Sequence, residues 1–128
     1  AIQVPQATVK PNDGKVHLAV RLTLPEGYKI NPQAPMAYRL ESSAKSGAVN
    51  RRALGKSIKL EEPATDVDID VPLSTDSGSD ELKLTLTYYY CQEGGAGLCK
   101  VGAAAWKIPI KLAADADTST VPLELEVK

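Results

Sequence analysis

The chain has 128 residues, 43% of them hydrophobic, and its 15 lysine and arginine residues nearly balance 16 acidic residues, giving a net charge of -1. A chain of this size can bury its own core, and a near-neutral charge gives no reason to expect nucleic acid or an anionic membrane as partner. No apolar stretch approaches the roughly 20 residues that cross a bilayer, so direct membrane insertion is not expected. Because the chain starts at Ala1 rather than at methionine, we expect residues 1–128 to be one domain processed or excised from a longer multidomain protein.

Alternating apolar and polar residues indicate β-strands from the start of the chain. Residues 3–10 carry a weak pattern, which ends at a Pro-Asn-Asp-Gly turn sequence at 11–14. Residues 15–24 place their aliphatic side chains on one face and His17 on the other, as in a half-buried antiparallel strand. We therefore predict that these two segments form a hairpin.

The middle of the chain has weaker periodicity. Residues 28–35 are predicted to be ordered but irregular, because Pro32 and Pro35 cannot donate to a strand ladder. A short strand is predicted at 36–42. Residues 43–55 mix small and basic side chains without a period and are interpreted as strand edges and loop.

The second half of the chain begins with a short predicted strand at 57–60. Residues 66–73 alternate aliphatic side chains with aspartates and a proline, which suggests a strand at the edge of a sheet. Residues 74–80 are predicted to be a polar loop.

The strongest strand pattern covers residues 82–91. Its predicted partner covers 99–112, and a final strand is expected at 121–127. Seven to nine short strands separated by turn signals favour an all-β fold, an immunoglobulin-like antiparallel β-sandwich formed by residues 1–128 as a single domain. A small barrel is the alternative.

The only two cysteines, Cys91 and Cys99, flank a glycine-rich segment between these two strongest strands. A β-hairpin would bring them together across its neck. Counting by twos from Leu82 and from Trp106, which belong to the apolar faces, places both cysteines on the outward face unless a bulge at Gly102 intervenes.

A same-face, cross-strand cysteine pair can form a disulfide, particularly at a non-hydrogen-bonded position. Closing a loop of this size would stabilise the fold by roughly 2 to 3 kcal/mol. The bond could be a passive staple or a bond that a partner thiol reaches, and Lys100 and Glu93 beside the cysteines oppose each other in charge. The residues alone leave staple, switch and compartment open.

Other candidate chemistry is sparse, and neither a metal nor another cofactor is expected. His17, the only histidine, would need a distant meeting with both cysteines and still lacks a fourth metal ligand, so it is interpreted as a surface strand residue. The aspartates at 66, 68 and 70 alternate along a strand instead of winding around a loop, so solvated edge charges explain them better than calcium ligands. Of the three consecutive tyrosines at 88–90, two must face the core.

Two segments resemble a known family. Tyr88-Tyr89-Tyr90-Cys91, a short loop, Cys99 and Trp106-Lys107-Ile108-Pro109-Ile110 resemble the C-terminal immunoglobulin-like domain of NHL-repeat-containing proteins that carry a thioredoxin-like domain. Residues 24–35 are similar to that family's segment of proline, glycine, lysine and an alanine-proline pair. More loosely, the chain resembles the N-terminal domain of the thiol-disulfide interchange protein DsbD, with a longer spacing between the cysteines.

The resemblance implies that Cys91 and Cys99 are the catalytic residues of a thiol-disulfide exchange module, with Tyr89 shielding the bond. It implies a thioredoxin-like domain as partner, in the same or another chain, together with an NHL propeller in the same chain. A periplasmic or otherwise exported location is favoured over the cytoplasm. The alternatives are a non-catalytic structural or interaction domain with a stapling disulfide and, from a different class, a carbohydrate-binding sandwich.

Overall fold

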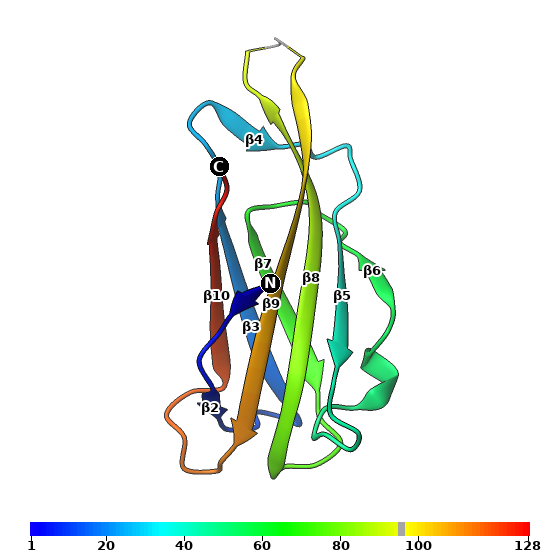
Figure 1. Cartoon of the computed structure of the whole chain (residues 1–128), viewed down its shortest axis with the longest axis vertical. Coiled ribbons are helices and arrows are strands. Elements are labelled where there is room, and N and C mark those ends of the chain that lie inside the picture. The colour runs from blue at the N-terminus through cyan, green and yellow to red at the C-terminus, as the bar shows by residue number, and fades with distance from the viewer. Residues whose placement is uncertain (95–96) are drawn as a thin grey trace.

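Two β-sheets pack face to face in the computed structural model, which describes residues 1–94 and 97–128 (Figure 1). The larger sheet has the order β1 (Ile2–Gln3), β9 (Cys99–Leu112), β8 (Gly78–Gln92), β5 (Ala37–Ser42) and β6 (Ser57–Lys59), with β2 (Ala7–Val9) also beside β9 and β4 (Tyr28–Ile30) beside β8. The smaller sheet has the order β10 (Thr120–Glu126), β3 (Lys15–Thr23) and β7 (Asp66–Pro72). A single 3-10 turn, η1 (Arg51–Ala53), lies between β5 and β6.

The strand order confirms the predicted all-β, immunoglobulin-like sandwich. In that fold the second and fifth strands pair in one sheet, and the third, sixth and seventh strands form the other. Here β3 pairs with β7, and β5, β8 and β9 are consecutive neighbours. The sheets are mixed rather than purely antiparallel, because β10 runs parallel to β3 and both β1 and β2 run parallel to β9. The described residues form ten strands, more than expected, because β1 and β4 are very short strands that the pattern does not reveal.

The predicted N-terminal hairpin is wrong. The turn at 11–14 exists, with Asp13 and Gly14 in the left-handed region, but only an isolated bridge joins Asn12 and Lys15. The chain crosses from one sheet to the other at this turn. That crossing lets Val9 of β2 and Val16 of β3, each 1% exposed, enter the core from opposite sheets.

Two boundaries also differ from the prediction. β4 occupies the start of the segment predicted to be irregular, and the prolines 32 and 35 follow it. β8 begins at Gly78, inside the predicted polar loop, because the opposite strand β9 is long enough to pair with it there. The predicted edge position of β7 is confirmed, and β3, β5, β6, β9 and β10 lie close to their predicted ranges.

The core lies between the sheets and consists of aliphatic side chains around Trp106, which is 1% exposed. Toward one end of the molecule the β8–β9 hairpin extends past the rest of the sandwich (Figure 1). Within the described part of the chain, no helix has the length and apolar character needed to cross a bilayer. The hairpin end, which carries both cysteines, therefore projects at one end of the sandwich.

Candidate redox site at the hairpin tip

An unbroken register in the β8–β9 hairpin determines which way each side chain points. Pairing runs without a bulge from Gly78 opposite Leu112 to Cys91 opposite Cys99. The even-numbered positions of β8 from Leu82 to Tyr90 are buried, and the odd-numbered positions are not. The predicted outward orientation of both cysteines is confirmed, and Gly102 introduces no bulge.

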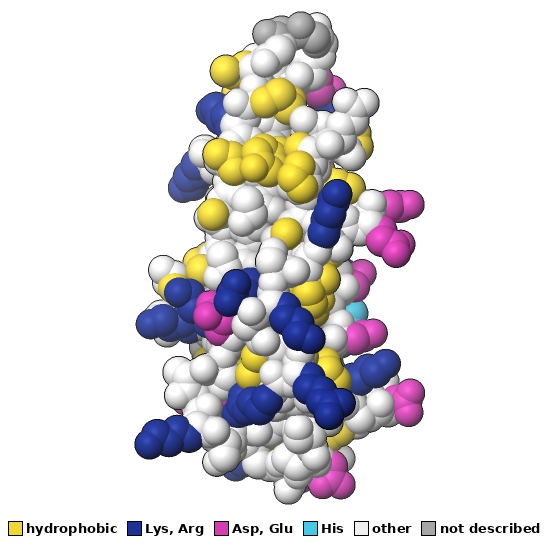
Figure 2. Space-filling model, turned by 90° about the vertical axis from the view of Figure 1, so that its right-hand side faces the viewer, with side chains coloured by type: hydrophobic (Ala, Val, Ile, Leu, Met, Phe, Trp, Pro, Cys, Tyr) yellow, Lys and Arg dark blue, Asp and Glu magenta, His cyan; other side chains and the backbone are white. Residues whose placement is uncertain are grey.

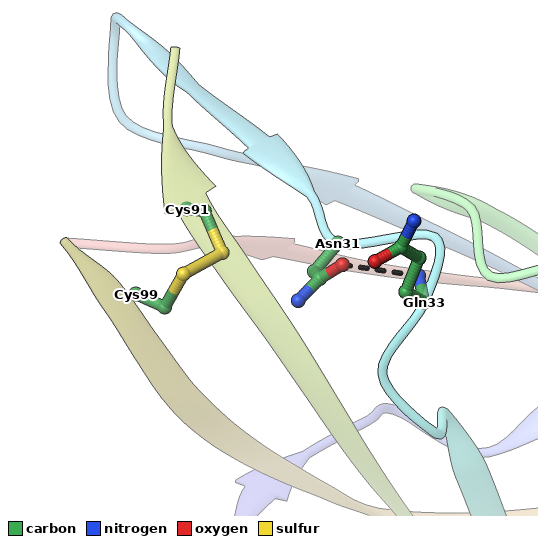
Figure 3. The surroundings of a disulfide bond; sticks show 4 residues. All are labelled: Asn31, Gln33, Cys91 and Cys99. Atoms are coloured by element: carbon green, nitrogen blue, oxygen red, sulfur yellow. Dashed lines mark hydrogen bonds between the residues drawn. A yellow bond between two sulfur atoms is a disulfide. The ribbon is translucent and has the colours of Figure 1, made fainter. Parts of the chain in front are cut away.

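Cys91 and Cys99 form a disulfide (Figure 3). Their Cα atoms lie 4.0 Å apart. The Gln92 N–H donates to the Leu98 carbonyl at 2.9 Å, so the next pair toward the tip is hydrogen-bonded and the cysteine pair is not. Non-hydrogen-bonded pairs have the shorter Cα separation, which brings the two sulfur atoms within bonding reach. Gly95 and Ala96, inside the predicted glycine-rich connection, lie outside the described residues.

The two cysteines differ in exposure. Cys91 is partly buried, because β4 pairs with β8 on its other side and sets Lys29 directly opposite Cys91. Cys99 is exposed. In the part of the chain that the structure describes, no strand pairs with β9 at Cys99 on the side away from β8. A partner thiol therefore meets Cys99 with less obstruction than Cys91.

A short segment after β4 lies beside the disulfide (Figure 3). The Asn31 N–H donates to the Tyr89 carbonyl at 2.9 Å, and the Asn31 Oδ1 accepts from the Gln33 N–H at 3.0 Å. These two bonds hold Asn31 next to Cys91. Sequence reasoning missed this neighbour. The only signal for a strand at this position was the apolar-polar-apolar order of Tyr28, Lys29 and Ile30, shortly before a proline.

The charges around the pair differ from the sequence-based interpretation. The Lys100 ammonium lies over the Tyr28 ring, 5.3 Å from its centroid, on the inner face of the hairpin. The cation that shares the outward face with Cys91 is Lys29, whose Nζ is 3.9 Å from a Glu93 carboxylate oxygen. Both of those side chains are well exposed, so this ion pair is weak and can rearrange.

Aromatic rings close the inner side of the hairpin. Tyr88 and Tyr90 are buried and their ring centroids lie 5.8 Å apart, while Tyr28 from β4 lies 5.4 Å from Tyr90. Tyr89 points outward on the same face as Cys91 and is half-buried. The prediction that two of the three consecutive tyrosines face inward is confirmed.

Exposed apolar side chains lie on both faces of the hairpin near its tip. Val101, opposite Tyr89, is 62% exposed, and Leu98 is 49% exposed. Figure 2 shows hydrophobic side chains gathered below the tip, whereas most of the Lys and Arg side chains lie lower in that view, among Asp and Glu side chains. Val101 thus places an exposed apolar side chain on the same face as the disulfide, two residues from Cys99.

His17 lies in the other sheet, away from the cysteines. Its ring nitrogens are 3.0 Å from an Asp70 oxygen and 3.1 Å from an Asp68 oxygen. The hydrogen bond to Asp70 is the main cause that raises the pKa of His17 above its usual value, with partial burial opposing it and Asp68 reinforcing it. The interpretation of His17 as a surface strand residue is confirmed. Among residues 1–94 and 97–128, no group of three or more His, Cys, Asp or Glu side chains is arranged to hold a metal ion.

The Cys91–Cys99 disulfide is thus the chemically distinct feature of this sandwich, with Lys29, Asn31 and Tyr89 around it. No protein-family model matches the chain, and no curated protein is significantly similar to it in sequence. The family to which the residue patterns point therefore remains a resemblance, and the site is interpreted from its geometry.

Proposed function

We propose that this domain is a thiol-disulfide exchange module, in which the Cys91–Cys99 disulfide reacts with a thioredoxin-like partner domain. The observation that supports this function best is the position of the bond. It lies on the outward face at the end of the hairpin, with Cys99 exposed. Thiol-disulfide exchange requires direct attack on a sulfur atom, so access is its first condition.

The independence of the core from the disulfide also supports this proposal. The buried cluster contains aliphatic and aromatic side chains from both sheets but neither cysteine. Breaking the bond therefore removes no core contact. A module that cycles between oxidised and reduced forms needs this separation, because the packed core then stays intact when the bond is reduced.

The exchange step proceeds from the more exposed side. A partner thiolate attacks the Cys99 sulfur, the Cys99–Cys91 bond breaks, and Cys91 leaves as a thiolate while a mixed disulfide forms between the partner and Cys99. A second partner thiolate then attacks the partner's own sulfur and releases Cys99 as a thiolate. The partner is oxidised, this domain is reduced by two electrons, and water supplies a proton to each thiolate that takes one up.

Lys29 favours this direction of attack. It faces Cys91 across the β4–β8 pair, so its ammonium can stabilise negative charge on the departing Cys91 sulfur. Glu93 competes for the same ammonium. The Asn31 side chain, held beside Cys91, leaves its amide group available as a hydrogen-bond donor because its oxygen is used by Gln33.

The test uses reduced thioredoxin whose second active-site cysteine is replaced by serine, so that the mixed disulfide accumulates. Peptide mass spectrometry of the trapped complex is expected to place the link on Cys99. With intact thioredoxin, Lys29→Gln should slow reduction roughly threefold, as expected for the loss of one exposed charge interaction. Lys107→Gln, a change in the same sheet but distant from the cysteines, is the matched control and should leave the rate unchanged.

The opposite result would favour the structural alternative. If thioredoxin fails to reduce the bond under conditions in which dithiothreitol reduces it, the disulfide is a staple and the domain is non-catalytic. A link found on Cys91 would retain exchange but overturn the proposed direction of attack.

A further inference from the structure

A stretch of β9 next to the cysteines has an open edge. On the side away from β8, β1 pairs with β9 only at Trp106 and Lys107, and β2 pairs with it only from Ile110 to Leu112. Within residues 1–94 and 97–128, no strand pairs with that side of β9 over residues 99–105. The backbone groups on that side are therefore available to another strand.

The hairpin register identifies which residues carry these groups. The hydrogen bond from Gln92 to Leu98 makes the even positions of β9 near the tip hydrogen-bonded partners of β8. The odd positions consequently direct their N–H and C=O groups to the open side. Lower in the strand, the odd-numbered Lys107 accepts a hydrogen bond from Val4 on that side, in agreement with this assignment.

Apart from Lys100, the open stretch lacks the usual protection against pairing. Natural edge strands are commonly guarded by charged residues, proline or a bulge. Residues 101–106 read Val-Gly-Ala-Ala-Ala-Trp, and the register continues through them without a bulge. An edge of this kind, regular and with Lys100 as its one charged residue, is suited to strand addition.

We propose that the occupant of this edge is a second copy of the same chain, joined by antiparallel pairing of the two β9 strands about a two-fold axis at Gly102. In this register Cys99 lies opposite Ala105 of the second copy, and Val101 lies opposite Ala103. The pairing uses all the free odd positions of the open stretch. It involves only residues that the structure describes and is independent of the exchange chemistry.

Side-chain complementarity favours the second copy over an unrelated strand. Each larger side chain of the stretch meets a small one, so the two outer faces fit together. Lys100 lies opposite Ala104 of the second copy, which keeps the two Lys100 ammonium groups apart. A symmetric pairing therefore brings no like charges into direct opposition.

Exposed apolar side chains give a separate argument. Ile2, Leu98 and Val101 are 36%, 49% and 62% exposed, and they are three of the four large hydrophobic side chains that are exposed among the described residues. The place beside Trp106 is already taken by Ile2, so in the proposed register the strand pairing ends at Ala105 and Leu98 of the second copy comes next to Ile2. All three side chains would then lie at the contact.

The overall shape permits this arrangement. Antiparallel pairing overlaps the two hairpin ends and leaves the sandwich bodies at opposite ends of the dimer, since the hairpin extends past the body (Figure 1). The outer face of the disulfide stays open, because the new strand lies beside β9 and not above it.

The test is sedimentation equilibrium of the oxidised protein from micromolar to millimolar concentration. The average mass is expected to rise from the monomer's 13.6 kDa toward twice that value. Ala103→Pro removes an N–H that faces the open edge and none that faces β8, so the variant should fold and stay monomeric. Ala103→Thr retains the N–H and should dimerise like the parent protein.

Hydrogen exchange provides the second measurement. The amides of Val101, Ala103 and Ala105 should exchange rapidly in dilute protein and become protected as the dimer forms, while Gly102 and Ala104 stay protected throughout. A protein that remains monomeric at millimolar concentration overturns the proposal. So does unchanged association of Ala103→Pro, which would indicate another contact surface, or protection of the edge amides in the monomer, which would indicate an occupant from the same chain.

Discussion

Asp80 illustrates how one buried side chain organises a loop. It is the only polar or charged residue that is fully buried among the described residues, at 2% exposure. Its carboxylate accepts hydrogen bonds from the Ser42 hydroxyl and from the N–H groups of Val49 and Glu81, and it lies 3.3 Å from the Arg51 guanidinium. These donors tie the connection between β5 and η1 to the start of β8.

Replacing Asp80 with alanine should therefore destabilise the protein by about 3 kcal/mol, because buried N–H groups would lose their acceptor. Urea unfolding followed by circular dichroism measures this loss. Asp76→Ala, in the exposed loop just before β8, is the control and should change stability by less than about 0.5 kcal/mol. Similar losses for the two variants would mean that the Asp80 contacts carry little net energy.

His17 gives the protein a pH-dependent contribution at the surface of the smaller sheet. Its folded-state pKa is raised above 6.5, mainly by the hydrogen bond to Asp70. A raised histidine pKa stabilises the fold fully below the unfolded pKa, and the stabilisation is lost as the pH rises through the folded pKa. The other hydrogen bond of His17, to Asp68, is the main cause that lowers the pKa of Asp68, so the contribution of Asp68 is lost as the pH falls through its folded pKa.

At pH 6 we expect the parent protein to have a higher free energy of unfolding than the His17→Gln variant. This difference in unfolding free energy should be smaller at pH 8. Because these side chains are partly exposed, the change should stay below about 1 kcal/mol. Parallel urea titrations of both proteins at the two pH values measure it. A difference that grows from pH 6 to pH 8 would contradict the assigned contacts.

At the scale of elements, the β8–β9 hairpin depends on a glycine in mid-strand. A β-carbon on Gly102 would lie 2.3 Å from the nearest atom of the Tyr88 ring, which covers the glycine from the inner face. The Tyr88 ring in turn contacts Tyr90. The glycine thus makes room for the aromatic row that closes this end of the core.

Gly102→Ala should displace the Tyr88 ring and destabilise the protein by about 1 to 3 kcal/mol, the usual range for overpacking. Thermal unfolding with near-ultraviolet circular dichroism reports both the stability and the tyrosine environment. Ala103→Ser, which alters the neighbouring outward position, serves as the comparison. An unchanged tyrosine signal in Gly102→Ala would show that the ring has space to move.

The elements that could be predicted from the sequence are those with one buried face. β3, β7 and β10 alternate cleanly because core and solvent lie on opposite sides of each strand. β4 was missed and β2 was assigned the wrong partner strand. A three-residue strand carries too little periodicity, and the partners of both strands are distant in sequence. The sequence pattern also placed Asp80 in a loop, because its hydrogen-bond donors are distant in sequence. These donors, around residues 42–51, make the burial of Asp80 possible.

The candidate site was predictable in part. Strand parity correctly placed Cys91 and Cys99 outward, because a two-residue period holds along an unbroken register. Lys29 and Asn31 were not expected beside them, because β4 reaches β8 from across the chain. Residues adjacent in sequence, such as Lys100, proved a poor guide to the charge around the pair.

For the molecule as a whole, the two outer faces carry opposite charge. Basic residues predominate on the outer face of the larger sheet, where Lys83 pairs across from Lys107, and acidic residues line β7 and the outward positions of β10 in the smaller sheet. The net charge of -1 hides this separation. A partner approaching the outer face of the larger sheet meets a cationic lower half and, at the end that holds the disulfide, the Lys29–Glu93 ion pair.

Removing the disulfide tests how far the whole fold depends on it. The Cys91→Ala, Cys99→Ala double variant should lose roughly 2 to 3 kcal/mol, as expected for opening a small loop, and should keep the native circular dichroism spectrum. Guanidinium unfolding of the variant and of the oxidised parent measures the difference. Loss of the folded state at room temperature would show that the hairpin end supports the core more than its contacts indicate.

The uninterrupted hairpin register has a consequence for how the chain matures. If β8 slipped by two residues along β9, each side chain would keep its face, but Cys91 would move opposite Val101 and out of reach of Cys99. Oxidation can therefore join the sulfur atoms only in the native alignment. Closing the bond therefore fixes the native register of the hairpin and excludes this two-residue slip.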